Sequence, residues 1–188
     1  MEAILKKEII FTKRLRTVFS VFIFITLTAL GAFVRIPLPF TPVPVTLQTF
    51  FVLLSGALLG SSLGLTTQLS YIFLGVLGLP IFSQAGSGLF YLFGPTGGYL
   101  VGFILASLWI GRAVRQMAKG FWLTFVTFCF ADLLILSCGL IWLKLFFGYS
   151  FGKLLFIGFV PFIPGDILKV FIATGIYLKL KGRFQAIL

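Results

Sequence analysis

The chain has 188 residues, of which 60% are hydrophobic and only 10% are charged, and its mean hydropathy is +1.16. In a soluble domain roughly a quarter of the residues are charged, so this composition excludes a soluble domain. It predicts a single membrane domain covering residues 1–188. The net charge of +11 does not indicate nucleic-acid binding, because the basic residues flank the apolar segments instead of sharing one face. We expect an all-α polytopic membrane protein, in which the backbone polar groups bond within their own helices.

The apolar segments predict six transmembrane helices, if one crossing takes about twenty residues. Residues 1–16 form a basic tail before the first segment. Prolines and glycines separate the later segments, because proline lacks the N–H that a helix needs and glycine favours turns. Residues 81–93 are rich in glycine and small polar side chains, so we expect a loop there. The predicted spans are approximately residues 17–36, 45–59, 63–79, 95–110, 121–147 and 154–178.

The basic residues also predict the orientation of these spans, because Lys and Arg accumulate in cytoplasmic flanks. With the N-terminus inside, eleven of the 15 basic residues lie in the two tails and in the loop after the fourth span. We therefore expect both termini in the cytoplasm, beside the lipid headgroups, and residues 35–44 and 81–93 in external loops that form one mouth. The eleven are Lys6, Lys7, Lys13, Arg14, Arg16, Arg112, Arg115, Lys119, Lys179, Lys181 and Arg183.

Two acidic residues, Asp132 and Asp166, lie in the predicted membrane body, whereas Glu2 and Glu8 belong to the tail. Charged groups inside a membrane are costly and often mark functional sites. Lys169 follows Asp166 by three positions, which puts both on one helix face. We expect this pair to face a polar ligand cavity, the alternative being a mutually neutralising ion pair. Asp132 is expected to meet either a basic flank or a partner subunit.

Other polar side chains in the predicted spans are few. Gln48 and Thr46 lie beside the proline-rich loop, and Gln84 lies in the glycine-rich loop. A glutamine amide in hydrocarbon needs a partner on another helix or a ligand, whereas a threonine hydroxyl can bond its own helix. Gly94, Gly98 and Gly102 form a stripe that admits a helix or a ligand at close approach.

The chain lacks residues that most enzymes need. It contains no histidine, which removes the commonest general base and metal ligand. It also contains no segment of the form G-x-x-x-x-G-K-[ST], so we expect no ATP hydrolysis by that route. We therefore expect a protein that is not an enzyme and holds no cofactor or metal.

Three separated blocks make the chain resemble the BioY family, the biotin-binding S components of energy-coupling-factor (ECF) transporters. The blocks are IPLPFTPVPVTLQT at residues 36–49, GPTGGYLVGF at residues 94–103 and PGDILK at residues 164–169. The resemblance extends over residues 29–173 and implies a six-helix S-component bundle that captures biotin from outside the bacterial cytoplasmic membrane. The alternatives are an S component for another small vitamin and a biotin transporter that works alone.

The resemblance also implies a site, in which biotin lies below the loops after the first and third spans. Asp166 and Lys169 match the Asp-x-x-Lys motif of the family. The substrate-binding residues that follow from the residues and the resemblance together are Thr46, Gln48, Gln84, Gly97, Tyr99, Asp166 and Lys169.

S components work with a membrane coupling subunit and two ATPase subunits, so the resemblance implies these partners here. Their docking face is a stripe of small residues on the first span. Thr28, Ala29 and Ala32 match this stripe. A pair of small residues four positions apart that began at Ala29 would need a small residue at position 33, but Phe33 is large. We expect the coupling subunit to dock at Thr28, Ala29 and Ala32, or to have diverged.

Overall fold

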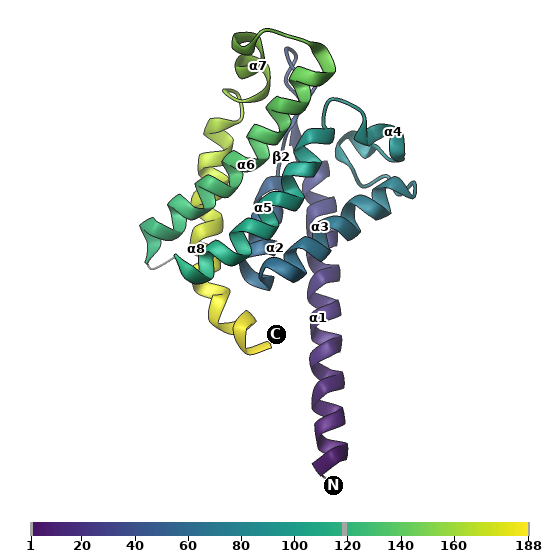
Figure 1. The fold of residues 1–188 in the computed structure, drawn as a ribbon, viewed down its shortest axis with the longest axis vertical. Helices are drawn as coiled ribbons and strands as arrows, with labels where there is room; N and C mark the ends of the chain where they lie inside the picture. The colour runs from purple at the N-terminus through teal and green to yellow at the C-terminus, as the bar shows by residue number, and fades with distance from the viewer. Residues whose placement is uncertain (1, 118–119, 188) are drawn as a thin grey trace.

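The computed structural model describes residues 2–117 and 120–187, with the side chains of residues 13–117 and 120–185. The side chains of Lys6, Lys7 and Lys119 therefore lie outside the described part of the predicted basic flanks. The long helices form a bundle, from which the first half of α1 extends (Figure 1). The elements are α1 (Glu2–Phe33), β1 (Arg35–Ile36), β2 (Val45–Thr46), α2 (Gln48–Leu59), α3 (Ser61–Val76), the 3-10 turn η1 (Ser83–Ala85), α4 (Leu89–Leu92), α5 (Gly97–Gln116), α6 (Phe121–Phe147), α7 (Phe151–Gly158) and α8 (Ile163–Ile187).

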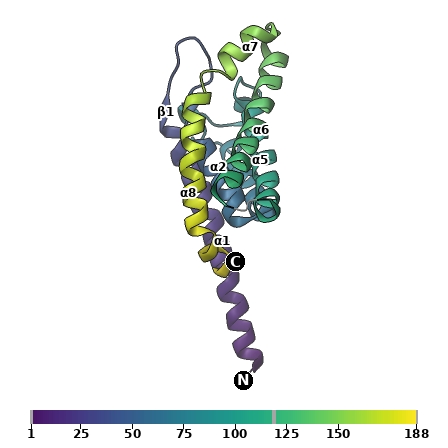
Figure 2. The same ribbon diagram turned by 90° about the vertical axis from the view of Figure 1, so that its left-hand side faces the viewer.

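Different structural elements lie at the two ends of the bundle. Helix α1 begins and helix α8 ends at the lower end in Figure 1, where α2 also turns into α3. The strands β1 and β2 and the loop between them lie toward the other end, as do α4 and α7 (Figures 1 and 2). The proline-rich and glycine-rich segments are thus on the same side of the bundle, as the sequence predicts.

Helix α5 lies at the centre and packs against α2, α3 and α6. Gly98 and Gly102 permit the close approach of α6, because a side chain at these positions would meet Trp142 and Ile135 respectively. Gly94 precedes α5, and its carbonyl accepts a hydrogen bond from Trp142 Nε1 at 2.9 Å. The predicted glycine stripe is therefore a surface for helix packing.

Three segments are long and apolar enough to cross a membrane, namely Lys13–Phe33 of α1, α5 and α6. Helices α7 and α8 add a fourth if they are counted as one span, bent by 50°. Helices α2 and α3 have 12 and 16 residues and are about 18 and 24 Å long, whereas the hydrocarbon core is about 30 Å thick. Within the described residues, length and composition therefore support three or four spans.

The last predicted span, residues 154–178, is not one continuous helix. It is divided between α7 and α8, and Pro161 lies in the break, where it has no N–H to continue the helical ladder. The amide of Asp166 donates to the carbonyl of Phe162 at 2.9 Å and so opens the ladder of α8. Asp166 consequently lies in the first turn of a helix, where the backbone N–H groups favour negative charge.

The prediction of a loop at residues 81–93 is wrong for η1 and α4. Phe82 is fully buried and anchors this segment, because its ring packs between Tyr71 and Tyr91 with centroid distances of 5.6 and 4.8 Å. The segment therefore folds back and packs against α3.

The expectation of an all-α chain misses a short ribbon. Strands β1 and β2 pair antiparallel, with Arg35 opposite Thr46 and Ile36 opposite Val45. The four prolines lie between the strands, where a missing N–H costs no ladder bond. The amide of Leu47 bonds to the last turn of α1, so the ribbon leads directly into α2.

Candidate ligand cavity

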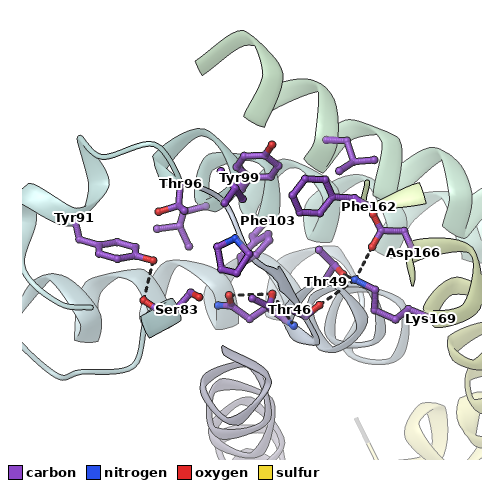
Figure 3. A pocket seen from close by; sticks show the side chains of 15 residues that line it. Thr46, Thr49, Ser83, Tyr91, Thr96, Tyr99, Phe103, Phe162, Asp166 and Lys169 are labelled. Carbon is purple, nitrogen blue, oxygen red and sulfur yellow. Dashed lines mark hydrogen bonds and ion pairs between the residues drawn. The ribbon is translucent and has the colours of Figure 1, made fainter. Parts of the chain in front are cut away.

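A cavity lies below the ribbon and the η1–α4 segment, and residues of α2, α5, α6 and α8 form its walls (Figure 3). Its volume of about 50 Å³ has room for a few water molecules, so a larger ligand requires the lining to move apart. The polar residues that line it are Thr46, Gln48, Thr49, Ser83, Tyr91, Thr96, Tyr99, Asp166 and Lys169.

Asp166 and Lys169 form an ion pair on one side of the cavity. Lys169 Nζ lies 2.5 Å from Asp166 Oδ1, and the two side chains are 12% and 5% exposed. Both carboxylate oxygens are buried, and Asp166 Oδ2 has no hydrogen-bond partner among the described residues. A buried polar atom without a partner is costly, so Oδ2 is an acceptor available to a ligand.

Lys169 is also held by the chain segment that enters α2. Its ammonium donates to the backbone carbonyl of Thr46 at 3.0 Å and to Thr49 Oγ1 at 2.8 Å. Together with Asp166, these two acceptors occupy the three donors of the ammonium group. A ligand that bonds to Lys169 must therefore replace or share one of these contacts.

Ser83 lies across the cavity from the ion pair (Figure 3). Its side chain is buried, and its hydroxyl has no hydrogen-bond partner among the residues that the structure describes. The Tyr91 hydroxyl donates to the Ser83 carbonyl at 3.1 Å, which fixes the backbone on this side. Two unsatisfied polar groups, on Ser83 and Asp166, thus face the cavity from opposite sides.

The Tyr91 hydroxyl stays protonated near neutral pH. Tyr91 lies on α4, outside the long helices, and burial raises the pKa of its phenol above the usual value. The nearby Thr96 side chain acts in the opposite direction. The cavity therefore offers a neutral donor and acceptor on this side and an ion pair on the other.

Gln48 connects the cavity to the η1–α4 segment. Its side-chain amide donates to the Tyr71 hydroxyl at 2.7 Å, and that hydroxyl donates to the Ile81 carbonyl at 2.8 Å. Gln48 Oε1 accepts a bond from the Thr46 hydroxyl at 3.3 Å. The buried glutamine amide thus has partners on two other segments, as a polar group in hydrocarbon requires.

Aromatic rings form the apolar wall. Tyr99 on α5 lies beside Phe162, with a centroid distance of 6.0 Å, and Phe103 follows Tyr99 by one helical turn. The Tyr99 hydroxyl donates to the carbonyl of Gly158 at 2.9 Å, which fixes the end of α7 above the cavity. The site therefore combines a flat apolar surface with charged and neutral polar groups, as is common in small-molecule sites.

Comparison with known proteins identifies the family. Residues 5–186 match the family model described as the BioY family. The chain belongs to the BioY family. It is an integral protein of the cytoplasmic membrane, and the resemblance carried by the three sequence blocks is confirmed.

Two curated relatives are both named biotin transporter BioY. The protein from Thermotoga maritima is 39% identical over 159 residues, which are 85% of this chain and 92% of that protein. The protein from Rhizobium etli is 34% identical over 157 residues, with 79% and 83% covered. A crystal structure of the S component for biotin from an ECF-type ABC transporter matches 90% of this chain and 92% of that chain, with a TM-score of 0.82. Its 24% sequence identity makes this a likeness of fold.

In this BioY-family chain, five of the seven predicted substrate-binding residues line the cavity. They come from β2, α2, α5 and α8, and the first and last of them, Thr46 and Lys169, are 123 positions apart along the chain. Their contact with a ligand stays a prediction. The five are Thr46, Gln48, Tyr99, Asp166 and Lys169.

Gln84 and Gly97 do not line the cavity. Gln84 is exposed and adopts a left-handed backbone with φ of 64°. It lines an outer hollow beside Pro95, which shares Ser83, Tyr91 and Thr96 with the cavity. Gly97 is a packing position, because a side chain there would collide with the Leu92 carbonyl and approach Trp142. Ser83, the neighbour of Gln84, lines the cavity instead, and contact of Gln84 with a ligand stays a prediction.

Several cavity residues were missed by the sequence analysis. Thr49 follows Gln48 at the start of α2, and its place at the end of the block IPLPFTPVPVTLQT was the available signal. Tyr91, Thr96 and Phe162 had no such signal, since only the folding of separate segments brings them to the cavity.

Asp132 is not paired with a basic flank among the described residues. It is buried on α6 and lines a second cavity of about 210 Å³ between α6 and α8, which also reaches Asp166. The expectation of a flank partner is therefore wrong within the described part of the chain.

The predicted docking residues do not form an exposed face. Thr28 and Ala32 are fully buried, and the Thr28 hydroxyl bonds to the Phe24 carbonyl at 2.7 Å. Ala29 is half-buried. The expectation that Thr28 and Ala32 offer a docking surface is wrong for this arrangement, because both point into the bundle.

Proposed function

We propose that this chain captures biotin and mediates its uptake across the cytoplasmic membrane, as the substrate-binding S component of an ECF-type transporter. Both curated relatives are named biotin transporters, and the structural neighbour is an S component for biotin. The observation that carries the proposal is the cavity itself, in which unsatisfied groups of Asp166 and Ser83 face each other across aromatic walls.

The chemistry of biotin matches the cavity lining. Biotin has two ureido N–H donors, a ureido carbonyl, an apolar ring with a thioether and a carboxylate on a flexible chain. In this proposal, the free oxygen of Asp166 accepts a ureido N–H bond, and Lys169 donates to an oxygen of the ligand. Tyr99 and Phe162 supply the flat surface for the apolar ring.

We further propose six membrane crossings with both termini in the cytoplasm. The short helices α2 and α3 then cross together with the extended segments that precede and follow them. This orientation is supported by the basic residues that cluster near the ends of α5 and α8, and by the common end at which α1 begins and α8 ends (Figure 1). The ligand cavity is then close to the external face.

The energy for uptake comes from other subunits in this proposal. A membrane coupling subunit and two ATPase subunits are the partners expected of an ECF-type S component, and the sequence has no nucleotide-binding segment of the common form. The chain then binds and releases its ligand without chemical change and without a cofactor. Its contact with the coupling subunit uses a surface other than Thr28 and Ala32, because both are buried.

Mass spectrometry of the small molecules that co-purify with the gently solubilised chain tests this proposal. We expect biotin to be released on denaturation. Release of a different vitamin would be consistent with the fold and the cavity but would contradict biotin as the substrate. Proteins that co-purify would identify the coupling partner, and uptake by the chain without them would favour a transporter that works alone.

A further inference from the structure

A large cavity, distinct from the two cavities that Asp166 lines, is located at the opposite end of the bundle, where α2, α3, α5 and α8 meet. Its volume is about 640 Å³, which is within the usual range of ligand pockets. Leu58, Leu63 and Phe184 form apolar walls. The ion pair and Ser83 lie elsewhere, so this cavity is separate from the candidate biotin site.

Two cations from different helices line this cavity, Arg115 of α5 and Lys181 of α8. The guanidinium of Arg115 lies beside the α2–α3 turn. If Gly60 in this turn carried a Cβ atom, that atom would lie 2.6 Å from Arg115 Nη2. Arginine and lysine side chains only donate hydrogen bonds. The cavity therefore presents a cluster of donors that calls for an acceptor.

Tyr177 adds a hydroxyl to these donors. Its side chain is 4% exposed and its ring packs against Phe128, with a centroid distance of 5.8 Å. The hydroxyl lines the cavity and makes no hydrogen bond to any residue that the structure describes. The hydroxyl can therefore donate to an external acceptor that enters the cavity.

The positive charge of the cavity has no described counter-charge. Asp132 and Asp166 line other cavities, and no carboxylate among the described side chains lines this one. Asp166 is paired with Lys169 instead. An anion from outside the described chain would therefore complement the charge of this cavity.

We propose that this cavity binds the phosphate group of an anionic phospholipid, with Arg115, Lys181 and Tyr177 as donors. A phosphate accepts several charge-assisted bonds at once, and arginine matches its geometry well. The apolar walls accommodate the start of the acyl chains, which a free inorganic phosphate lacks. With the topology proposed above, the lipid belongs to the inner leaflet, where anionic headgroups attract basic residues.

Native mass spectrometry of the full-length chain in detergent, with phosphatidylglycerol or phosphatidylcholine added, tests this proposal. We expect the parent to retain phosphatidylglycerol in preference to phosphatidylcholine. The double variant Arg115→Gln/Lys181→Gln should bind phosphatidylglycerol roughly tenfold to thirtyfold more weakly, since each basic residue near anionic lipid contributes to binding. Tyr177→Phe keeps the ring and should weaken binding by about threefold or more.

The matched control is Arg112→Gln/Lys179→Gln, which removes the same charges from the same two helices at exposed positions outside the cavity. This control should retain the lipid, and both double variants should bind biotin as the parent does, which separates this inference from the proposed function.

Equal lipid loss in the two double variants, or no preference for phosphatidylglycerol, would overturn the proposal. So would displacement of the lipid by inorganic phosphate, or unchanged lipid binding together with loss of a co-purifying acidic protein. If Arg115→Gln/Lys181→Gln does not fold, lipid retention by Tyr177→Phe equal to that of the parent overturns the proposal.

Discussion

Lys169 on α8 donates a hydrogen bond to the backbone carbonyl of Thr46, 123 positions earlier in the chain, at 3.0 Å. The same ammonium is paired with Asp166, so one side chain joins the ribbon to the helix that carries the acidic group. A change at Lys169 should therefore affect both the stability of the cavity and its affinity for ligand.

Lys169→Met removes the charge and keeps most of the apolar stem. It leaves the Asp166 carboxylate and the Thr46 carbonyl without their partner, and breaking a buried ion pair from one side costs about 3 kcal/mol. Thermal unfolding of the detergent-solubilised chain without biotin should show a clearly lower midpoint. The double variant Asp166→Asn/Lys169→Met should recover part of the loss, because no buried charge remains. A single variant as stable as the parent would contradict the role of Lys169 in joining the segments.

Tyr71→Phe tests the connection between Gln48 and the η1–α4 segment. The change removes the hydroxyl that bonds to Gln48 and to the Ile81 carbonyl, at a cost of about 1–3 kcal/mol. Hydrogen exchange should become faster in residues 81–93 and stay unchanged in α6. Tyr149→Phe is the control, because the Tyr149 hydroxyl has no hydrogen bond to the described residues. Unchanged exchange in residues 81–93 would mean that aromatic packing alone holds the segment.

Local spacing was enough to predict that Asp166 and Lys169 share a helix face, but not what surrounds them. Asp166 and Lys169 are three positions apart on one helix, so any helix there brings them to one face. The contacts of Lys169 with Thr46 and Thr49 join segments more than a hundred positions apart, which no local pattern reports.

The errors of the sequence analysis have local causes. Two adjacent residues of η1, Gln84 and Ala85, adopt left-handed backbone conformations that non-glycine residues seldom take, and Gln84 is exposed as a result. Hydropathy alone does not show the bend between α7 and α8, because the break at Pro161 is surrounded by apolar residues. Hydropathy likewise cannot report which face of α1 is buried, so it did not separate Thr28 and Ala32 from an exposed stripe.

Gly98→Ala tests the packing of α5 against α6. The added carbon would collide with Trp142 and lie 2.6 Å from the Cys138 carbonyl, and such overpacking costs about 1–3 kcal/mol. The control is Gly175→Ala on α8, where nothing lies within 4 Å, so the change should be neutral or stabilise by up to about 1 kcal/mol. The unfolding midpoint of Gly98→Ala should thus fall, whereas that of Gly175→Ala should stay unchanged or rise. Equal midpoints would contradict the close approach of the two helices.

A calorimetric titration of the purified chain with biotin tests the central claim most directly, when it is repeated with Asp166→Asn and Asp132→Asn. Each variant replaces one carboxyl oxygen of a buried acid by an amide nitrogen, but only Asp166 lines the candidate biotin cavity. We expect saturable binding of one biotin per chain, weakened roughly tenfold to hundredfold in Asp166→Asn, since a hydrogen bond to a charged group contributes about 1.5–3 kcal/mol. Asp132→Asn should bind nearly as the parent does. A parent that does not bind biotin, or an Asp166→Asn variant that binds it equally well, would contradict the account.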